Sequence, residues 1–258
     1  MKTLILSIIS LMICFGSFSQ DEKKSPLLSG KIIYKEVQKM NIQLEGDAAE
    51  FAHMLPKERT SYKSLIFNED ASLYENSKAE VEDAVSHVEE SEGMMVQIQM
   101  VEPENKIYVD FDEKKAIEQR EFMTRNFLIE KELSLIDWKI TGSQKGILGY
   151  QCTEAVCKNS KGEEIKAWFA PQIPVSAGPD TLYNLPGMIV ELDIADGDIM
   201  LTAMSIEDIS IDKSQLKKPK KGKKVTHEEF KEIVAKKMKE MGAESVEGVH
   251  TVVEIRHD

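Results

Sequence analysis

The segment Ala167–Asp193 constrains the fold more than any other part of this chain, because proline interrupts it repeatedly. Four of the chain's 8 prolines stand here, at Pro171, Pro174, Pro179 and Pro186. Proline fixes φ and removes a backbone donor, so the segment cannot be a helix interior or a central strand. The residues on either side, 165–169 and 188–194, have the composition and alternation of strands. The sequence therefore predicts a strand, a rigid irregular loop and a second strand.

The predicted loop is more apolar than a solvated connection, which leaves two interpretations open. The loop packs over the end of a hydrophobic core, or it forms a stiff, preformed binding surface, since loops held by a scaffold often carry function. The residues that such a surface would offer are Trp168, Tyr183, Leu185, Pro186 and Gly187. We expect no catalytic loop, because the segment holds no histidine, no cysteine and no clustered carboxylates for acid–base chemistry.

Alternating apolar residues and turn signals continue along most of the chain. They predict strands over 31–37, 61–67, 71–74, 94–100, 106–111, 116–123, 127–130, 135–141, 149–157, 163–169, 188–194 and 198–206. Consecutive hairpins of this kind form an antiparallel meander. We therefore predict a mainly β (α+β) fold, with an antiparallel sheet able to curve into a half-barrel and a C-terminal amphipathic helix. A short helix over 47–54, an exposed acidic insertion over 75–93 and a last strand over 248–256 are further expectations.

The C-terminal part has a different character. The stretch 217–224 is rich in lysine and predicts either a solvated tether or a contact with acidic surface, such as lipopolysaccharide phosphates or the protein's own acidic insertion. Thr226 and Glu229 have the spacing of a capping box at a helix start. The apolar stripe of this helix consists of Phe230, Ile233, Val234, Met238 and Met241. Gly242 marks its end, and we expect the stripe to pack on the sheet, with a partner or a membrane surface as the alternative.

The chain begins like an exported protein. Lys2 precedes an apolar run over 4–15, and small residues before Gln20 offer a cleavage site, as in a secretory signal peptide. The run is too short to span a membrane, and Cys14 follows Ile13 where a lipoprotein signal needs a small residue. We expect four regions: a signal peptide over 1–20, a β domain over 21–210, a basic linker over 211–225, and a helix with its tail over 226–258. The mature protein is then periplasmic or secreted, with association to the outer membrane as a further option, and does not span the membrane.

Charge and cysteine content limit the partners. A net charge of −12 disfavours nucleic acid. Cys152 and Cys157, if both lie on one strand, are about 16 Å apart and on opposite faces, whereas a disulfide needs less than about 7 Å. We expect two buried free thiols, unless a bulge or turn lies between them. Copper binding through Met94, Met95, Met100 and a cysteine is a weaker alternative, and the sequence predicts no cofactor.

The central segment resembles the GLPGLI family of secreted bacterial proteins. The family's motif corresponds here to residues 184–189, with Asn184 in place of its first glycine and Met188 in place of its second leucine. The stretches 138–140, 145–152 and 154–155 are also similar to the family pattern. The resemblance covers roughly 30–208 and is specific over 138–193. It implies a β-rich envelope or secreted protein of Gram-negative bacteria, and the family offers no established activity or catalytic residues to carry over.

No catalytic motif is visible in the sequence. There is no nucleophile elbow, phosphate loop or paired-histidine zinc helix. We expect a non-catalytic binding protein, for a lipid, a hydrophobic small molecule or an outer-membrane protein partner. An enzyme with a dispersed site is the alternative. An exposed apolar groove would favour the first class, and a cleft lined with perturbed carboxylates would favour the second.

Overall fold

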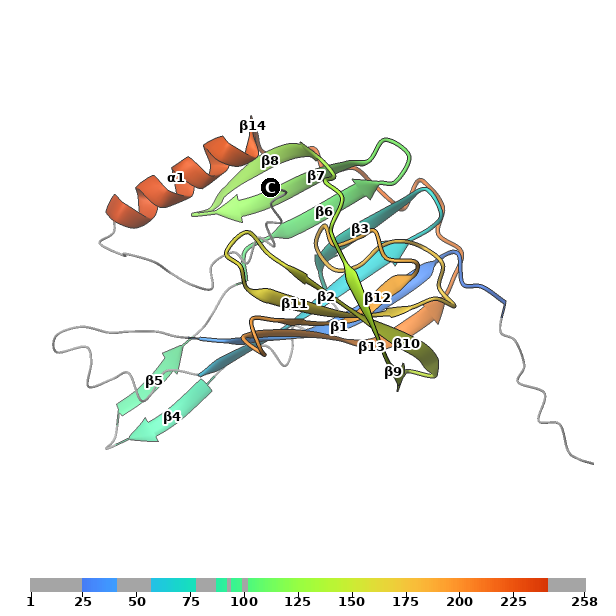
Figure 1. The fold of residues 1–258 in the computed structure, drawn as a ribbon. Coiled ribbons are helices and arrows are strands. Elements are labelled where there is room, and N and C mark those ends of the chain that lie inside the picture. Colours follow the sequence, from blue (N-terminus) through green and yellow to red (C-terminus); the bar gives the residue numbers. More distant parts are fainter. Residues whose placement is uncertain (1–24, 41–56, 78–86, 92–93, 99–101, 241–258) are drawn as a thin grey trace, which may run out of the picture.

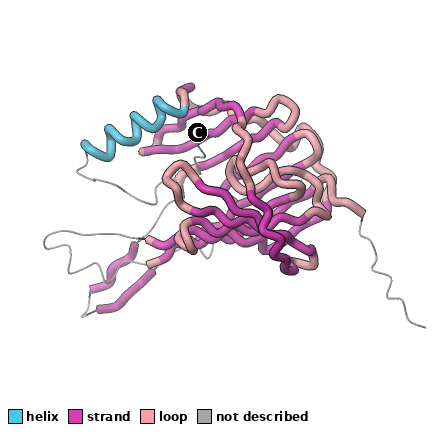
Figure 2. The backbone as a smooth tube through the Cα atoms, in the orientation of Figure 1, coloured by secondary structure: helices cyan, strands magenta, loops and turns pink. Residues whose placement is uncertain are grey.

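The computed structural model describes residues 25–40, 57–77, 87–91, 94–98 and 102–240, with the backbone alone for 87–91 and 94–98. Within these ranges the chain is mostly β with one helix, which confirms the predicted fold class (Figures 1 and 2). The strands are β1 Gly30–Lys39, β2 Glu58–Phe67, β3 Ala71–Asn76, β4 His87–Ser91, β5 Met94–Ile98, β6 Asn105–Asp110, β7 Lys115–Phe122, β8 Arg125–Glu132, β9 Lys139–Ile147, β10 Tyr150–Lys158, β11 Glu164–Ala170, β12 Met188–Ile194, β13 Ile199–Asp208 and β14 Lys223–Val225. The helix is α1, His227–Glu240.

Twelve of these strands form one open, curled sheet in the order β14-β8-β7-β6-β3-β2-β1-β13-β12-β11-β10-β9, and β4 pairs with β5 separately. Neighbours are antiparallel, except that β14 runs parallel to β8. The sheet is not one meander, because β1 pairs with β2 on one side and with β13 on the other. Strand β1 therefore lies in the middle of the sheet and joins its N-terminal half to its C-terminal half (Figure 1).

One face of the curled sheet, here called the inner face, carries the main hydrophobic core. Ile32 and Tyr34 of β1 point to it and are fully buried. Alternation along the strand selects these positions, because every second side chain lies on the same face. The Tyr34 hydroxyl donates a 2.6 Å hydrogen bond to the carbonyl oxygen of Ile189 on β12. This bond ties the middle of the sheet to the strand that follows the proline-rich segment.

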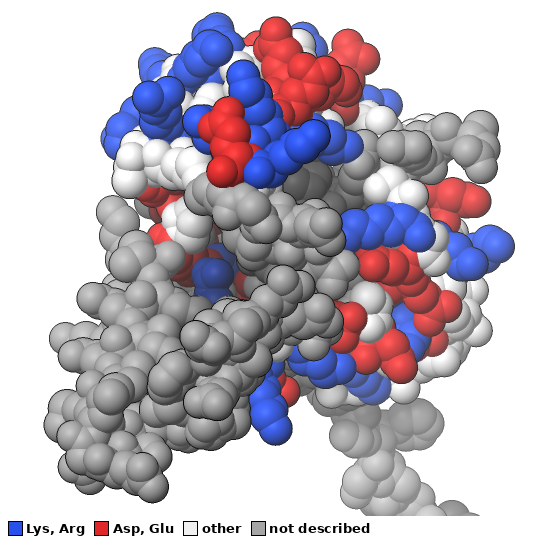
Figure 3. All heavy atoms as spheres, turned by 90° about the vertical axis from the view of Figure 1, so that its left-hand side faces the viewer, with Lys and Arg blue, Asp and Glu red and all other residues white. Residues whose placement is uncertain are grey.

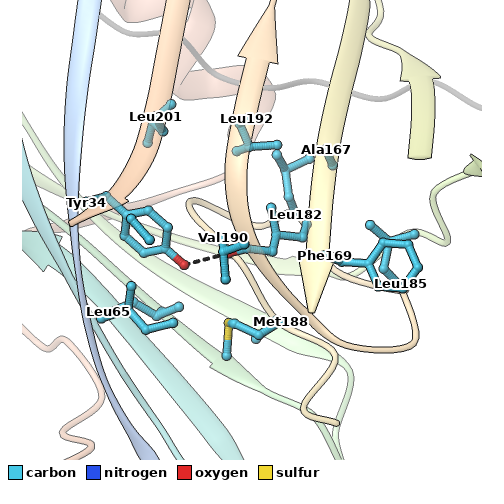
Figure 4. Packing of buried hydrophobic residues seen from close by; sticks show 14 of the residues in the cluster. Tyr34, Leu65, Ala167, Phe169, Leu182, Leu185, Met188, Val190, Leu192 and Leu201 are labelled. Carbon is cyan, nitrogen blue, oxygen red and sulfur yellow. Dashed lines mark hydrogen bonds between the residues drawn. The ribbon is translucent and has the colours of Figure 1, made fainter. Parts of the chain in front are cut away.

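The proline-rich segment between β11 and β12, residues 171–187, is here called the central loop. It packs over the inner face, with Ile173, Val175, Leu182 and Leu185 only 0–5% exposed. Its own hydrogen bonds hold it there, since the backbone N–H of Met188 donates to the Ile173 carbonyl over 2.9 Å. Figure 4 shows loop side chains among those of β11 and β12. Of the two interpretations left open by the sequence, packing over the core describes this loop.

The segment 211–240 is here called the C-terminal strap, and its first residues, 211–216, cross the other face of the sheet. Ile211 and Leu216 are buried against Leu73 of β3 and Tyr108 of β6. Its lysines pair with acids of the sheet region, as in the 3.1 Å contact of Lys218 with Asp110. The lysine side chains of 217–224 are exposed, as a solvated tether predicts, but Pro219 is buried and β14 pairs with β8, so the sheet holds the backbone of this stretch. The expected contact with the protein's own acids is present, but the acids belong to the sheet.

The strap then adds β14 to the sheet and places α1 against β8. The predicted capping box is confirmed: Thr226 N–H donates to the Glu229 carboxylate over 2.9 Å, and Glu229 N–H donates to the Thr226 hydroxyl over 3.1 Å. Phe230 is buried, and its ring centroid lies 5.3 Å from that of Phe127. The rest of the described stripe packs against the same cluster, namely Ile233, Val234 and Met238. The prediction that the stripe packs on the sheet is thus confirmed for these residues.

The two cysteines agree with the expectation from the sequence. Cys152 and Cys157 are free and buried, and both lie on β10. β10 pairs with β11 from Thr153 onward without a register shift. The shift between β10 and β9 places its extra residues on β9. Side chains on β10 therefore alternate without interruption, and the odd separation of the two thiols puts them on opposite faces.

The structure also corrects the strand predicted over 135–141. Residues 133–138 have no regular structure, and β9 begins only at Lys139 and continues to Ile147. The predicted signal peptide, the helix over 47–54 and the strand over 248–256 lie outside the described residues, as do Met100, Met241 and Gly242. Among the described residues, no helix combines the length and apolar character needed to cross a membrane.

Candidate functional site

A cavity of about 90 Å³, here called the end pocket, opens on the inner side of the curled sheet. Its polar lining comes from five strands and two connections: Glu36, Gln38, Arg59, Lys63, Tyr74, Glu102, Asn105, Arg120 and Asp180. Its apolar lining consists of Pro103, Pro179, Leu182, Leu192, Ile194, Ile199 and Leu201. The central loop therefore contributes directly to this pocket through residues 179, 180 and 182.

Alternation along the strands brings charges into the pocket. Glu36 lies two residues beyond Tyr34, on the inner face of β1. Across the sheet, Glu118 and Arg120 of β7 are also on the inner face, since Ala116 of the same strand is part of the core. Residues two apart on a strand share a face. Charged residues at these positions are therefore buried by the fold itself.

Around the β1 and β2 side of the pocket, one carboxylate serves two cations. Glu102 pairs with Arg59 over 3.0 Å and with Lys63 in a close contact. The Lys63 ammonium is only 6% exposed and also donates to the Asn76 side chain over 3.3 Å. Glu36 accepts a long 3.5 Å hydrogen bond from the Ser61 hydroxyl. This side of the pocket thus presents both signs of charge in a partly desolvated setting.

Around the opposite side, buried charges tie the central loop to the sheet. Arg120 donates to Glu118 over 2.7 Å, and its guanidinium stands 3.5 Å from Asp180 of the loop. Lys131 of β8 completes the group, with its ammonium 2.6 Å from Glu118 and 3.3 Å from the Thr181 hydroxyl. Glu118 is fully buried and Arg120 is 3% exposed. We call these four charged residues the buried tetrad.

The two carboxylates beside the pocket differ in acidity because their partners differ. Desolvation raises the pKa of Glu36, and nearby Lys63 only partly offsets it. Desolvation also acts on Glu118, but Arg120 and Lys131 outweigh it and lower the pKa of Glu118 to about 2. Desolvation lowers the pKa of Arg120, but Glu118 and Asp180 together outweigh it and raise the pKa, so this group stays charged. Glu36 thus holds a proton more readily than an ordinary carboxylate, and Glu118 holds one less readily.

Three buried polar atoms that line the end pocket lack a hydrogen-bond partner among the described residues. They are the side-chain oxygen Oδ1 of Asn105, Oδ1 of Asp180 and the guanidinium nitrogen Nη2 of Arg120. Buried polar groups are nearly always hydrogen-bonded, because leaving one unpaired costs about 1–3 kcal/mol. Two acceptors therefore remain without a hydrogen bond inside a single small cavity, and Arg120 Nη2 has the long 3.5 Å ion pair with Asp180 Oδ2.

The five residues predicted from the sequence do not converge on one place. Trp168 lies on the outer side of β11, where the Lys145 ammonium stands 4.2 Å from its ring centroid. Tyr183 donates to the Leu133 carbonyl over 3.2 Å. Leu185 is buried, Pro186 is exposed and Gly187 lies against the Ala170 backbone. None of the five lines the end pocket, and their role in binding stays a prediction.

The thiols offer little chemistry in this setting. Burial raises the pKa of Cys152 to about 11 and that of Cys157 to about 12. Both are protonated at neutral pH, whereas the thiolate is the nucleophile and the metal ligand. The methionine side chains of the copper interpretation, at 94, 95 and 100, lie outside what the structure describes.

Sequence reasoning missed the residues of the end pocket, although one signal was present. In β7, Ala116, Glu118, Arg120 and Phe122 alternate with Ile117, Gln119 and Glu121. Two opposite charges on the face of an alanine and a phenylalanine indicate a buried ion pair. Nothing in the sequence, however, indicates that Asp180 would meet this pair, because that contact depends on how the loop crosses the sheet.

Part of this region matches the model of a known protein family. Residues 157–191, from the end of β10 through the central loop into β12, match the family model described as "Protein of unknown function (Porph_ging)". The comparison with curated proteins gave no match. The chain is similar to two crystal structures of PNGF-II, in space groups C2 and P21, with TM-scores of 0.54 and identities of 17% and 16%. The alignments cover 81% of this chain and 33% of PNGF-II, so the chain spans about a third of that protein. At this identity the similarity shows the fold alone.

Neither sign of charge dominates the described residues on the face of the molecule seen in Figure 3. On the face seen in Figure 3, basic and acidic side chains lie interspersed, and both signs are visible inside a hollow of that face. Mixed charge of this kind suits a polar partner better than a strongly anionic or cationic one.

Proposed function

We propose that this chain is an exported, non-catalytic binding protein whose ligand is small and polar and occupies the end pocket. The single observation that carries the proposal is the convergence of three buried atoms that lack a hydrogen bond, on Asn105, Arg120 and Asp180, in one cavity. A ligand that offers both donors and acceptors would satisfy them. The predicted signal peptide and the resemblance to the GLPGLI family support export.

A hydrophobic ligand, which the sequence led us to expect, has less support than a polar ligand. A carrier of lipids needs a vacant apolar groove, whereas the central loop's own side chains occupy the inner face, with Ile173 at 0% exposed. An outer-membrane protein partner stays a prediction, since it would require a surface and not the pocket.

The proposal is tested by thermal unfolding of the mature chain with two panels of compounds. One panel is polar (monosaccharides, amino acids and polyamines), and the other is apolar (fatty acids and long-chain alcohols). The key variant is Asn105→Leu, which removes an unpartnered acceptor from the pocket. Its matched control is Asn126→Leu, because Asn126 also carries a buried unpartnered oxygen but does not line the pocket.

We expect a polar compound to raise the Tm of the wild type and of Asn126→Leu, but not that of Asn105→Leu. Stabilisation by apolar compounds alone, or equal responses of the two variants, would overturn the proposal.

A second candidate is an enzyme, favoured by the raised pKa of Glu36 inside the pocket. A carboxyl group with a raised pKa is better suited to donate a proton than an ordinary glutamate. Glu36→Gln separates the two functions. A binding protein keeps its ligand intact with either residue, whereas an enzyme converts the bound compound with Glu36 and leaves it unchanged with Gln, as mass spectrometry of the mixture would show.

A further inference from the structure

Three atoms of the end pocket that lack a hydrogen bond differ in charge. Arg120 Nη2 is a cationic donor with only a long 3.5 Å ion pair to Asp180 Oδ2. Asp180 Oδ1 is an anionic acceptor, and Asn105 Oδ1 is a neutral acceptor. An ammonium group has donors only, and a carboxylate has acceptors only. The two acceptors therefore match an ammonium group, and the guanidinium matches a carboxylate.

The formal charges of the pocket lining cancel. Arg59, Lys63 and Arg120 stand against Glu36, Glu102 and Asp180. A ligand with net charge would leave an uncompensated charge in a desolvated cavity, which is costly. A ligand with two opposite charges and no net charge avoids this cost.

The spacing of the protein charges also limits the ligand. Arg120 Nη2 and Asp180 Oδ2 are 3.5 Å apart. The groups that meet them must be similarly close, as an ammonium and a carboxylate attached to one carbon are. A cavity of about 90 Å³ is well above the roughly 10–15 Å³ that one water needs and excludes a large ligand.

Both anchoring groups are held in place before any ligand arrives. The Arg120 guanidinium is oriented by its 2.7 Å bond to the buried Glu118. Asp180 has a φ of 57° and lies in a turn closed by the 3.2 Å hydrogen bond from the Leu182 N–H to the Pro179 carbonyl. Such preorganisation lowers the entropy cost of binding.

We infer that the end pocket takes a small zwitterion of the α-amino acid class, with its carboxylate on Arg120 and its ammonium on Asp180 and Asn105. This inference rests on the proposed function, because it names the ligand class of the same pocket. It also gives the central loop a second role, since the loop that fills the core delivers the carboxylate of Asp180.

The test is isothermal titration of the mature chain with glycine, L-alanine and L-serine, alongside ethylamine, propionate and D-glucose. We expect at least one zwitterion to bind and neither single-charge analogue to bind. Asp180→Asn should weaken that zwitterion at least tenfold, because asparagine tolerates the positive φ but lacks the charge. Asn105→Leu should weaken it as well, and Asn126→Leu should not. Circular dichroism confirms that each variant is folded.

The outcomes separate this inference from the proposed function. Binding of D-glucose, or of ethylamine or propionate as tightly as L-alanine, overturns the zwitterion and leaves the polar pocket standing if Asn105→Leu removes that binding. An unchanged affinity in a folded Asp180→Asn also overturns it. If no polar compound binds at all, both proposals fall.

Discussion

The central loop and β9 differ in burial in the opposite sense to their secondary structure, because the irregular loop is buried and the strand is exposed. The loop, residues 171–187, contains no strand or helix, yet Ile173, Leu182 and Leu185 are 0–2% exposed. β9 is a strand of 9 residues, yet none of its residues is buried and Ile140 is 55% exposed. Strand pairing and burial are therefore independent in this protein. Burial depends on where a segment lies relative to the curl of the sheet, since the loop crosses the inner face and β9 is the edge strand.

Proline explains how an irregular segment can be buried at low cost. A buried loop normally leaves backbone donors without partners. The four prolines of the loop have no N–H to satisfy, and other donors have found carbonyls, as Ile189 N–H has at Ala177 over 2.9 Å. The same residues that exclude a strand therefore make the loop suitable as core.

The largest expected difference between the two regions concerns their ion pairs. Glu118→Gln removes the central anion of the buried tetrad that ties the loop to the sheet, and should cost about 3–5 kcal/mol of unfolding free energy. Glu191→Gln removes the partner of Lys145 on β9, a 2.6 Å pair that is partly exposed, and should cost about 0–1 kcal/mol. Urea unfolding at pH 7 measures both. Equal costs would contradict the structural role of the tetrad.

The same carboxylate predicts a pH dependence. The pKa of Glu118 is lowered from 4.5 to about 2 in the folded chain, so its contribution is fully present above about pH 4.5 and is lost as the pH falls towards 2. The wild type should lose stability over this range, and Glu118→Gln should lose less. Parallel pH profiles for the two proteins would show that Glu118 is not the group responsible.

Truncating an isoleucine in each region should give the next largest contrast. Ile173→Ala leaves a cavity in the core and should cost about 2–5 kcal/mol. Ile140→Ala, on the exposed side of β9, should stay within about 0.5 kcal/mol of the wild type. Chemical denaturation measures the pair, and a small effect at Ile173 would mean that the loop can leave the sheet without loss.

Adding a methyl group to a glycine in each region should give the smallest contrast. A Cβ at Gly187, where φ is 156°, would lie 2.4 Å from the Ala170 carbonyl oxygen. Gly187→Ala should therefore cost about 1–3 kcal/mol. A Cβ at Gly146 of β9 meets no atom within 4 Å, so Gly146→Ala should be neutral or stabilising by roughly 0.5 kcal/mol. The Tm values of the two variants measure this contrast. A Gly187→Ala protein as stable as the wild type would contradict the tight packing of Gly187 against Ala170.

The sequence was sufficient to predict the local elements with clear patterns. Strand alternation and turn residues placed the hairpins around Asn68 and around Asn159–Gly162, where side chains of the turn asparagines cap the chain reversal. The capping box at Thr226 located the helix. These features depend on neighbours in the chain, so their signals are local.

The features that required the structure depend on distant contacts or broken periods. The polar residues of β9 gave no alternation to detect, and the irregular pairing of this strand with β10 has no signal in the sequence. The end pocket joins residues as far apart as Glu36 and Asp180. No spacing in the sequence indicates such a meeting, because it arises from the pairing of β1 with β13 and from the path of the loop.

Native mass spectrometry of the protein, purified from the cells that produce it, tests the central claim most directly. If the loop fills the core and the end pocket is the binding site, the spectrum should show a small polar adduct with the wild type and Asn126→Leu, and no adduct with Asn105→Leu. A lipid-sized adduct retained by all three proteins would contradict the account, because the inner face would then hold a ligand in the space assigned to the loop.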